Sequence, residues 1–155
     1  MGDDQLCYST TIVAPVPSEK AVAFLRSPEG VGTWALGTWG TTSVEGKDGV
    51  YVGRSLLDGT ERSFFRVLEE GARGVVEYEV GGTADALTMR VAAKVVAGED
   101  FGYGADHCLV TLLGWRPQDM GDVRWRRLCA FHDVEILMIE ARLKGQWPPG
   151  QGNVS

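Results

Sequence analysis

The sequence has few histidines and cysteines, the side chains that most often bind zinc or form disulfide crosslinks. Its 155 residues include two histidines and three cysteines, and no two cysteines form a CxxC pair. An odd number of isolated cysteines favours free thiols in a reducing compartment over a disulfide framework. A zinc site would require Cys7, Cys108, His107 and His132 to meet in space, and their spacing gives no support for that. We therefore expect no metal and no cofactor.

Positive charge and long apolar runs are also scarce. Fifteen Lys and Arg are set against 21 Asp and Glu, so the formal net charge is −6. An acidic chain without a basic stripe is a poor candidate for binding nucleic acid, because phosphate neutralisation dominates such affinities. No apolar run approaches the ~20 residues that span a bilayer, and the acidic start MGDDQLCYS lacks a signal-peptide core. These absences predict a cytoplasmic protein with no nucleic-acid partner and no membrane span.

The longest regular stretch covers residues 122–144, which contain neither Pro nor Gly. Apolar side chains recur there at spacings of three and four, so they share one face of a helix. That face consists of Trp125, Leu128, Cys129, His132, Ile136, Ile139 and Leu143. The imidazole of His132 therefore points the same way as an otherwise apolar stripe.

A weaker apolar strip lies on the opposite side of the same predicted helix. It consists of Val134, Leu137, Met138 and Ala141. A helix that is apolar on two sides is usually buried on two sides. Two interpretations are open: the strip packs under a loop, or it is a self-association surface that makes the protein a homodimer.

Upstream of this helix the pattern is one of short strands and turns. A strand is predicted over 6–13, a short helix over 18–25, a break at 27–30 and a second short helix within 31–39. Six further strands are predicted at hairpin spacing, over 41–45, 50–57, 61–69, 75–80, 87–96 and 107–115. In the strand over 87–96, strict alternation puts Met89 on the inner face and Arg90 on the outer face.

These elements predict an α+β fold. Short connections favour antiparallel pairing of neighbouring strands. A twisted sheet with one apolar face must cover that face, and the helix over 122–144 is the only element large enough. We therefore expect a curved antiparallel sheet wrapped around a long C-terminal helix, with residues 1–145 as one domain and 146–155 as a C-terminal tail.

Several local features match a known superfamily. They are the first strand running into Ala14-Pro15, the helix SEKAVAFL, Pro28 followed by Trp34, Val52-Gly53 opening a strand, the stretch FFRVLEEGARGVVEYEV, and the last helix with His132 and Glu135. On these features the chain resembles, over residues 6–145, the SRPBCC superfamily of START, Bet v 1-like and polyketide cyclase/dehydrase proteins, which has the helix-grip fold.

The resemblance implies a cavity between the sheet and the last helix that holds a hydrophobic ligand. It implies an aromatic or polyketide-like small molecule that is cyclised or dehydrated by acid–base chemistry. The alternatives are a non-catalytic carrier or sensor for a lipid or similar ligand, and an interaction module of the Hsp90-activator type.

Three side chains are candidates for the acid–base chemistry. His132 is the strongest, because an imidazole exchanges protons near neutral pH. Tyr78 is on the apolar face of an alternating strand, and its hydroxyl is a candidate partner. Glu61 opens a strand, and a buried Glu there would have a raised pKa and serve as an acid. Their structural alternatives are a core histidine, a core tyrosine and a solvated strand end.

Aromatic and apolar side chains are expected to form the ligand-binding wall. The resemblance places Trp34 and Trp39 in the segment that rims the cavity. Trp115 and Trp125 flank the start of the predicted long helix. Plain core packing is the alternative for these tryptophans. The candidate ligand-binding residues are Trp34, Trp39, Phe65, Met89, Trp115, Trp125, Cys129 and Ile136.

Three arginines, Arg124, Arg126 and Arg127, lie in the first turns of the predicted long helix. Positive charge is unfavourable there, because the N-terminal end of a helix is already positive. Two interpretations are open: the arginines pair locally with Asp119 and Asp122, or they bind an anionic group of a ligand.

Overall fold

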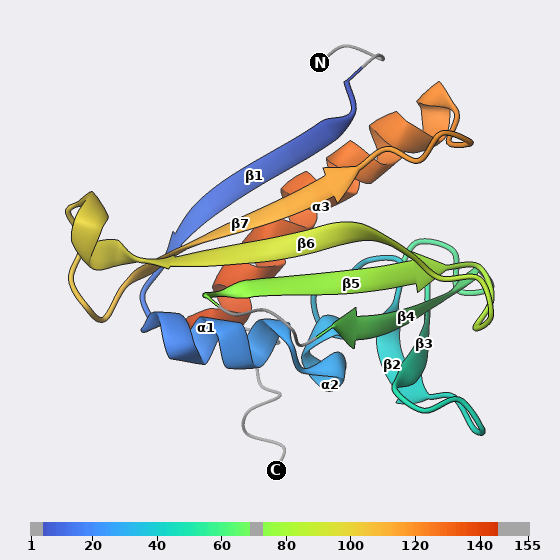
Figure 1. Ribbon diagram of the computed structural model, residues 1–155, viewed down its shortest axis with the longest axis horizontal. Coiled ribbons are helices and arrows are strands. Elements are labelled where there is room, and N and C mark those ends of the chain that lie inside the picture. Colours follow the sequence, from blue (N-terminus) through green and yellow to red (C-terminus); the bar gives the residue numbers. More distant parts are fainter. Residues whose placement is uncertain (1–4, 69–72, 146–155) are drawn as a thin grey trace.

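The computed structural model describes residues 5–68 and 73–145, and the predicted tail over 146–155 lies outside the described residues. Helices and strands follow one another in the order that Figure 1 labels. They are β1 (Cys7–Ala14), α1 (Ser18–Leu25), α2 (Pro28–Val31), β2 (Trp39–Ser43), β3 (Val50–Arg54), β4 (Arg62–Leu68), β5 (Val75–Gly81), β6 (Thr88–Ala97), the 3-10 helix η1 (Gly98–Phe101), β7 (Cys108–Trp115) and α3 (Asp122–Leu143).

The strands form one antiparallel sheet in the order β1-β7-β6-β5-β4-β3-β2. Each hairpin-connected strand lies beside its neighbour in sequence, and β1 pairs with β7 along its whole length. Figure 1 shows α3 running along one face of this sheet, with α1 and α2 near its lower edge. The predicted α+β helix-grip architecture is confirmed.

The predicted inner face of α3 is confirmed. All seven of its residues are buried except Leu128, which is partly buried, and Glu135 joins them. Ile136, Ile139 and Leu143 of this face belong to the main core with inner sheet residues that include Phe65, Val110 and Leu112. Trp125 and Cys129 form a second cluster with Met120 near the start of the helix.

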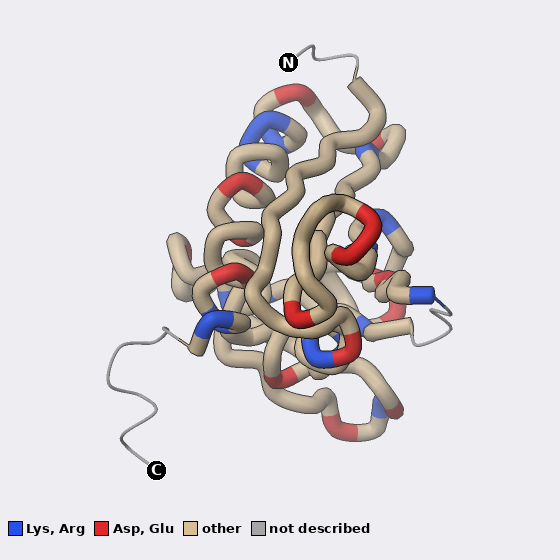
Figure 2. The backbone as a smooth tube through the Cα atoms, turned by 90° about the vertical axis from the view of Figure 1, so that its left-hand side faces the viewer, with Lys and Arg blue, Asp and Glu red and all other residues tan. Residues whose placement is uncertain are grey.

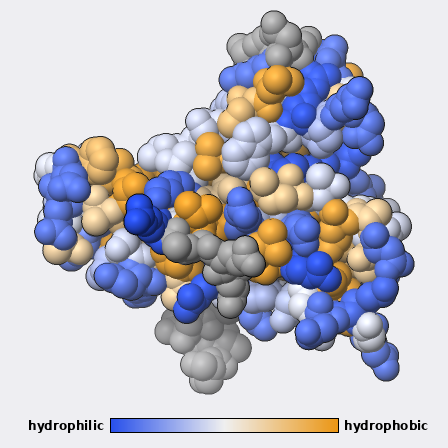
Figure 3. Space-filling view, in the orientation of Figure 1, coloured by the Kyte–Doolittle hydropathy of each residue, from blue (hydrophilic) through white to orange (hydrophobic). Residues whose placement is uncertain are grey.

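The opposite side of α3 is open to solvent at two of its four apolar positions. The side chains of Val134 and Leu137 are 47% and 57% exposed, whereas Met138 packs against the main core. Within the described residues no loop covers Val134 or Leu137, so the loop interpretation is wrong for these two. Self-association through this strip stays a prediction. The face of the molecule seen in Figure 3 intersperses hydrophobic and hydrophilic side chains.

The first helix ends at Leu25, as predicted, and a separate helical turn, α2, begins at Pro28 within the predicted break over 27–30. Ser27 caps α2 by accepting a hydrogen bond on its side-chain oxygen from the N–H of Gly30, at 3.1 Å. Pro28 occupies the first helical position, where a missing N–H has no cost. The helix ends at Val31, so the second short helix predicted within 31–39 is not formed beyond that residue, and turns lead on to β2.

A β-bulge in β6 interrupts the alternation that the sequence predicts. Tyr78 is opposite Val91 and Glu79 is opposite Met89, which leaves Arg90 as an extra residue between them. Met89 is 38% exposed, whereas Arg90 is partly buried and lines an interior cavity. The prediction that Met89 faces inward and Arg90 outward is therefore wrong, because a bulge re-aims the side chains of its strand.

Candidate functional site

A cavity of about 250 Å³ lies between the inner face of the sheet and α3. Residues from the α2–β2 segment, from β4, β5 and β6, and from the first half of α3 form its walls, and most of the wall surface is apolar. The apolar lining includes Val31, Trp34, Phe65, Val80, Val91, Leu128 and Phe131. The volume lies just below the ~300–1,000 Å³ of typical ligand sites, so the cavity suits a small ligand.

His132 lies in this wall, and its side chain is almost fully buried. Its ring packs against Gly114 of β7, where an added Cβ would lie 2.6 Å from the ring Cε1. Within the described residues, Nδ1 is buried and has no hydrogen-bond partner. Burial lowers the pKa of His132 to about 4, against a smaller opposing effect of the Asp133 charge. The imidazole is therefore neutral at pH 7 and has a lone pair available.

Glu135 lies one helical turn further along α3 and also lines the cavity. One carboxyl oxygen, Oε2, accepts a hydrogen bond from the backbone N–H of Leu36 at 2.9 Å. The other, Oε1, is 3.8 Å from Nε2 of His132. Burial raises the pKa of Glu135 to about 8, although the Leu36 hydrogen bond opposes this. Glu135 is therefore mostly protonated at neutral pH.

His132 and Glu135 thus form a pair whose environments push their pKa values in opposite directions. At neutral pH one group can accept a proton and its neighbour can donate one, which is the usual arrangement of an acid–base site. Sequence reasoning did not include Glu135 among the site residues. The available signal was an acidic side chain three residues from His132, on a helix face that has to be buried.

The hydroxyl of Tyr78 is committed to the backbone. Tyr78 is buried in the cavity wall, and its hydroxyl donates a hydrogen bond to the carbonyl oxygen of Leu25 at 2.6 Å. Burial raises the pKa of this hydroxyl. The indole of Trp34 packs edge-on against the phenol ring, with centroids 5.8 Å apart. The hydroxyl proton of Tyr78 is used in this hydrogen bond, which connects β5 to the end of α1.

Arginines form a polar part of the lining. Arg90 of β6 and Arg124 and Arg127 of α3 all line the cavity. The blue segments at the upper end of α3 in Figure 2 show how positive charge gathers where this helix begins.

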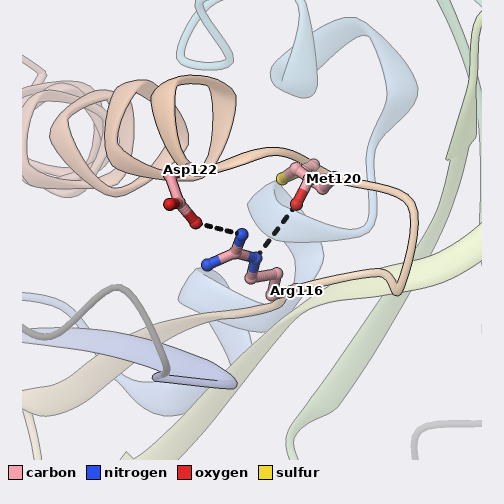
Figure 4. A network of polar contacts seen from close by, with 3 residues as sticks. All are labelled: Arg116, Met120 and Asp122. Carbon is pink, nitrogen blue, oxygen red and sulfur yellow. Dashed lines mark hydrogen bonds and ion pairs between the residues drawn. The ribbon is translucent and has the colours of Figure 1, made fainter.

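The local pairing predicted for Asp122 is not the one observed. Its carboxylate accepts a hydrogen bond from Arg116 Nη2 at 2.6 Å, and Arg116 Nε donates to the carbonyl of Met120 at 3.1 Å (Figure 4). The Arg116 hydrogen bond, with a smaller contribution from the charge of Arg126, holds the pKa of Asp122 below its usual value. Arg116 thus joins the end of β7 to the first turn of α3.

No known family model matches the chain, and no curated protein matches it in sequence. Solved structures do match. A START superfamily protein from Mycobacterium smegmatis aligns with a TM-score of 0.60 at 13% identity, over 91% of this chain and 99% of that one. The Aha1 dimer from Colwellia psychrerythraea gives 0.65 at 12%, over 93% and 100%. The Zhui aromatase/cyclase from a Streptomyces species gives 0.62 at 12%, over 94% and 97%.

The chain has the helix-grip fold that these structures share. At such identities the likeness is one of fold alone, and function has to be argued from the site. Within the described residues of this helix-grip domain, no helix is long and apolar enough to cross a membrane. The same residues contain no group of three or more His, Cys, Asp or Glu side chains that could hold a metal ion.

The helix-grip cavity brings together five of the side chains predicted from the sequence. His132, Tyr78, Glu61, Trp34 and Phe65 all line it. Glu61 is exposed where the chain enters β4, which corresponds to the solvated strand end rather than to a buried acid. The proposed catalytic role of Glu61 therefore lacks the burial that it was expected to have.

The other predicted ligand-binding residues do not line the helix-grip cavity. Trp125 and Cys129 are fully buried in the second apolar cluster, and Ile136 is in the main core. Met89 is turned outward by the bulge in β6. These four side chains shape the protein without contacting the cavity space.

Trp115 and Trp39 also lie away from the cavity lining. Trp115 is 37% exposed at the end of β7. Trp39 begins β2, and the Arg142 guanidinium lies over its ring at 5.9 Å from the centroid. The resemblance placed Trp39 with Trp34 at the rim of the cavity, but of these two only Trp34 lines it.

Proposed function

We propose that the chain binds a small aromatic or polyketide-like molecule in the cavity beside α3 and catalyses its cyclisation or dehydration by proton transfer. The observation that supports this is the buried His132–Glu135 pair, with its nitrogen and oxygen 3.8 Å apart in an otherwise mainly apolar wall. A protein described as an aromatase/cyclase shares the fold.

The pair suits reactions next to a carbonyl group. In a dehydration, His132 accepts the proton from the carbon beside the carbonyl, and Glu135 gives its proton to the hydroxyl group that leaves as water. In a cyclisation, the same carbon attacks a second carbonyl of the folded substrate, and Glu135 protonates the oxygen of that carbonyl. The cavity contributes by holding the reacting atoms close together.

His132 is the proton acceptor, as predicted from the sequence, but its partner is Glu135 and not Tyr78 or Glu61. The Tyr78 hydroxyl donates a hydrogen bond to the carbonyl oxygen of Leu25, and Glu61 is exposed, whereas Glu135 is buried and has a pKa raised to about 8. A group whose pKa is close to neutral pH is the more effective general acid.

The experiment that tests this uses 2-tetralone, a small two-ring ketone whose protons beside the carbonyl exchange with D2O. We expect the protein to accelerate this exchange, measured by proton NMR. We expect His132→Gln and Glu135→Gln each to reduce the acceleration by about 10²-fold or more. His107→Gln is the matched control, because His107 lies just before β7, is only partly buried and does not line the cavity. Equal rates for the wild-type protein and His132→Gln would contradict the proposal.

A non-catalytic carrier of a hydrophobic ligand is the second candidate function. It is favoured by the pKa of His132, which at about 4 makes the imidazole a weak base. Saturable binding of 2-tetralone without faster exchange is the result expected for a carrier. An interaction module of the Hsp90-activator type has less support, because aromatic side chains do not fill the cavity space.

A further inference from the structure

We propose that the ligand is a monocarboxylate and that Arg90, with Arg124 and Arg127, binds its carboxylate group inside the cavity. This inference rests on the proposed function, since it names the charged group of the small apolar molecule that the cavity is proposed to bind.

Arg90 reaches the cavity only because of the bulge in β6. The bulge leaves Arg90 as the extra residue opposite the Tyr78–Glu79 step, and its side chain becomes part of the lining. Its Nε is buried and has no hydrogen-bond partner within the described residues. Partial burial of a guanidinium without a counter-ion is unfavourable, and an anionic ligand would offset that cost.

Two further guanidinium groups line the same space. Burial lowers the pKa of Arg90, and the positive charge of Arg124, which lines the same cavity, lowers it further. Arg127 is stacked at 6.0 Å from the ring centroid of Phe131, which is also in the lining. Among the residues that the structure describes, no acidic side chain forms an ion pair with any of the three. The acidic side chain that acts on Arg90 is Asp119, through its charge and not through a hydrogen bond.

The charges that line the cavity favour a ligand with one negative charge. Asp58 and Glu61 line it as well as the three arginines, so the lining carries 3 − 2 = +1 while Glu135 is protonated. Asp58 is already engaged, because its carboxylate accepts hydrogen bonds from the N–H and hydroxyl of Thr60 at 3.1 and 2.6 Å. A net charge of +1 in the lining is neutralised by a carboxylate, whereas a phosphate dianion would leave an excess of negative charge.

The shape of the site also fits a carboxylate on an apolar body. The planar fork of a guanidinium matches the two oxygens of a carboxylate. Trp34 and Phe65 supply apolar walls in the same cavity. An aromatic monocarboxylate would therefore place its ring between these walls and its charge on Arg90.

The test compares two ligands with one skeleton, 2-naphthoate and the neutral 2-naphthamide, by isothermal titration calorimetry on the full chain. We expect 2-naphthoate to bind at least about tenfold more tightly than 2-naphthamide. We expect Arg90→Gln to remove this preference and to leave the affinity for 2-naphthamide unchanged. Arg124→Gln, at an exposed position on α3, is a second variant that is expected to reduce the preference in part.

Arg62→Gln is the matched control, because Arg62 is an exposed strand arginine whose neighbour Ser63 lines the cavity, so that Arg62 points away from it. It is expected to keep the full preference. Equal affinities for the two ligands in the wild-type protein, or a preference that survives Arg90→Gln, would overturn the carboxylate inference and leave the proposed function standing. Failure of both ligands to bind would overturn the proposed function together with this inference.

Discussion

The imidazole of His132 occupies the space that a side chain at Gly114 would need. A Cβ added to Gly114 would lie 2.6 Å from Cε1 and 3.2 Å from Nδ1 of the ring. Gly114 is paired with Tyr8 of β1 on one side and with Val91 of β6 on the other. The helix can therefore approach three strands of the sheet at this point, because the central strand has no side chain there.

This contact predicts the effect of Gly114→Ala. The added methyl group collides with a buried ring, and overpacking of this kind typically lowers the free energy of unfolding by about 1–3 kcal/mol. Urea denaturation measures the loss. In a His132→Ala background the same change should cost much less, because the ring is gone. If the losses of stability in the two single variants sum to the loss in the double variant, the contact between the His132 ring and position 114 is contradicted.

The buried carboxyl of Glu135 predicts a pH-dependent stability. Its pKa is about 8 in the folded protein, against an ordinary value of 4.5, so the folded state keeps a proton that the unfolded state releases. The stabilisation is complete below pH 4.5 and is lost as the pH rises towards 8. Relative to Glu135→Gln, the wild-type protein should lose up to about 1.4 kcal/mol for each pH unit in this window. Denaturation at pH 5 and pH 7.5 measures the difference, and two parallel pH profiles would contradict the burial of Glu135.

The hydrogen bond from Tyr78 to Leu25 predicts a structural role for the phenol. Tyr78→Phe leaves the buried carbonyl of Leu25 without this donor, which should cost about 1–3 kcal/mol of stability. Exchange of 2-tetralone protons should continue at the wild-type rate per folded molecule, because the hydroxyl takes no part in the proton transfer. Loss of exchange activity with unchanged stability would instead show that the Tyr78 hydroxyl takes part in the proton transfer.

Much of the fold could be predicted from the residues alone. The inner face of α3 follows from spacings of three and four, and the antiparallel sheet follows from short strands joined by turns. Both signals are local and repeat many times. The packing of α3 against the sheet then follows, because no other element in the described part of the chain is long enough to cover the apolar face.

The candidate site could be predicted only in part. His132 was found because spacings of three and four place it on the inner face of the long helix, and Trp34 because the resemblance places its segment at the rim of the cavity. Phe65 was a candidate, although Phe64 beside it left the inward face of that strand undecided. Arg90 was missed because the extra residue of the bulge turns Met89 outward and Arg90 towards the cavity. Composition does not reveal a bulge. Glu135 was missed although it lies three residues from His132, since the partner of its carboxyl group, the N–H of Leu36, is 99 residues away in sequence.

Imidazole NMR shows whether a ligand binds in the cavity beside His132. The chain has only two histidines, and His107, stacked on Tyr103, is not part of the cavity lining. His107 thus serves as an internal reference in a ¹⁵N-labelled sample titrated with 2-tetralone. We expect saturable shifts of the His132 ring signals, with those of His107 unchanged. Unchanged His132 signals at the highest ligand concentration, or equal shifts at both rings, would contradict binding in this cavity.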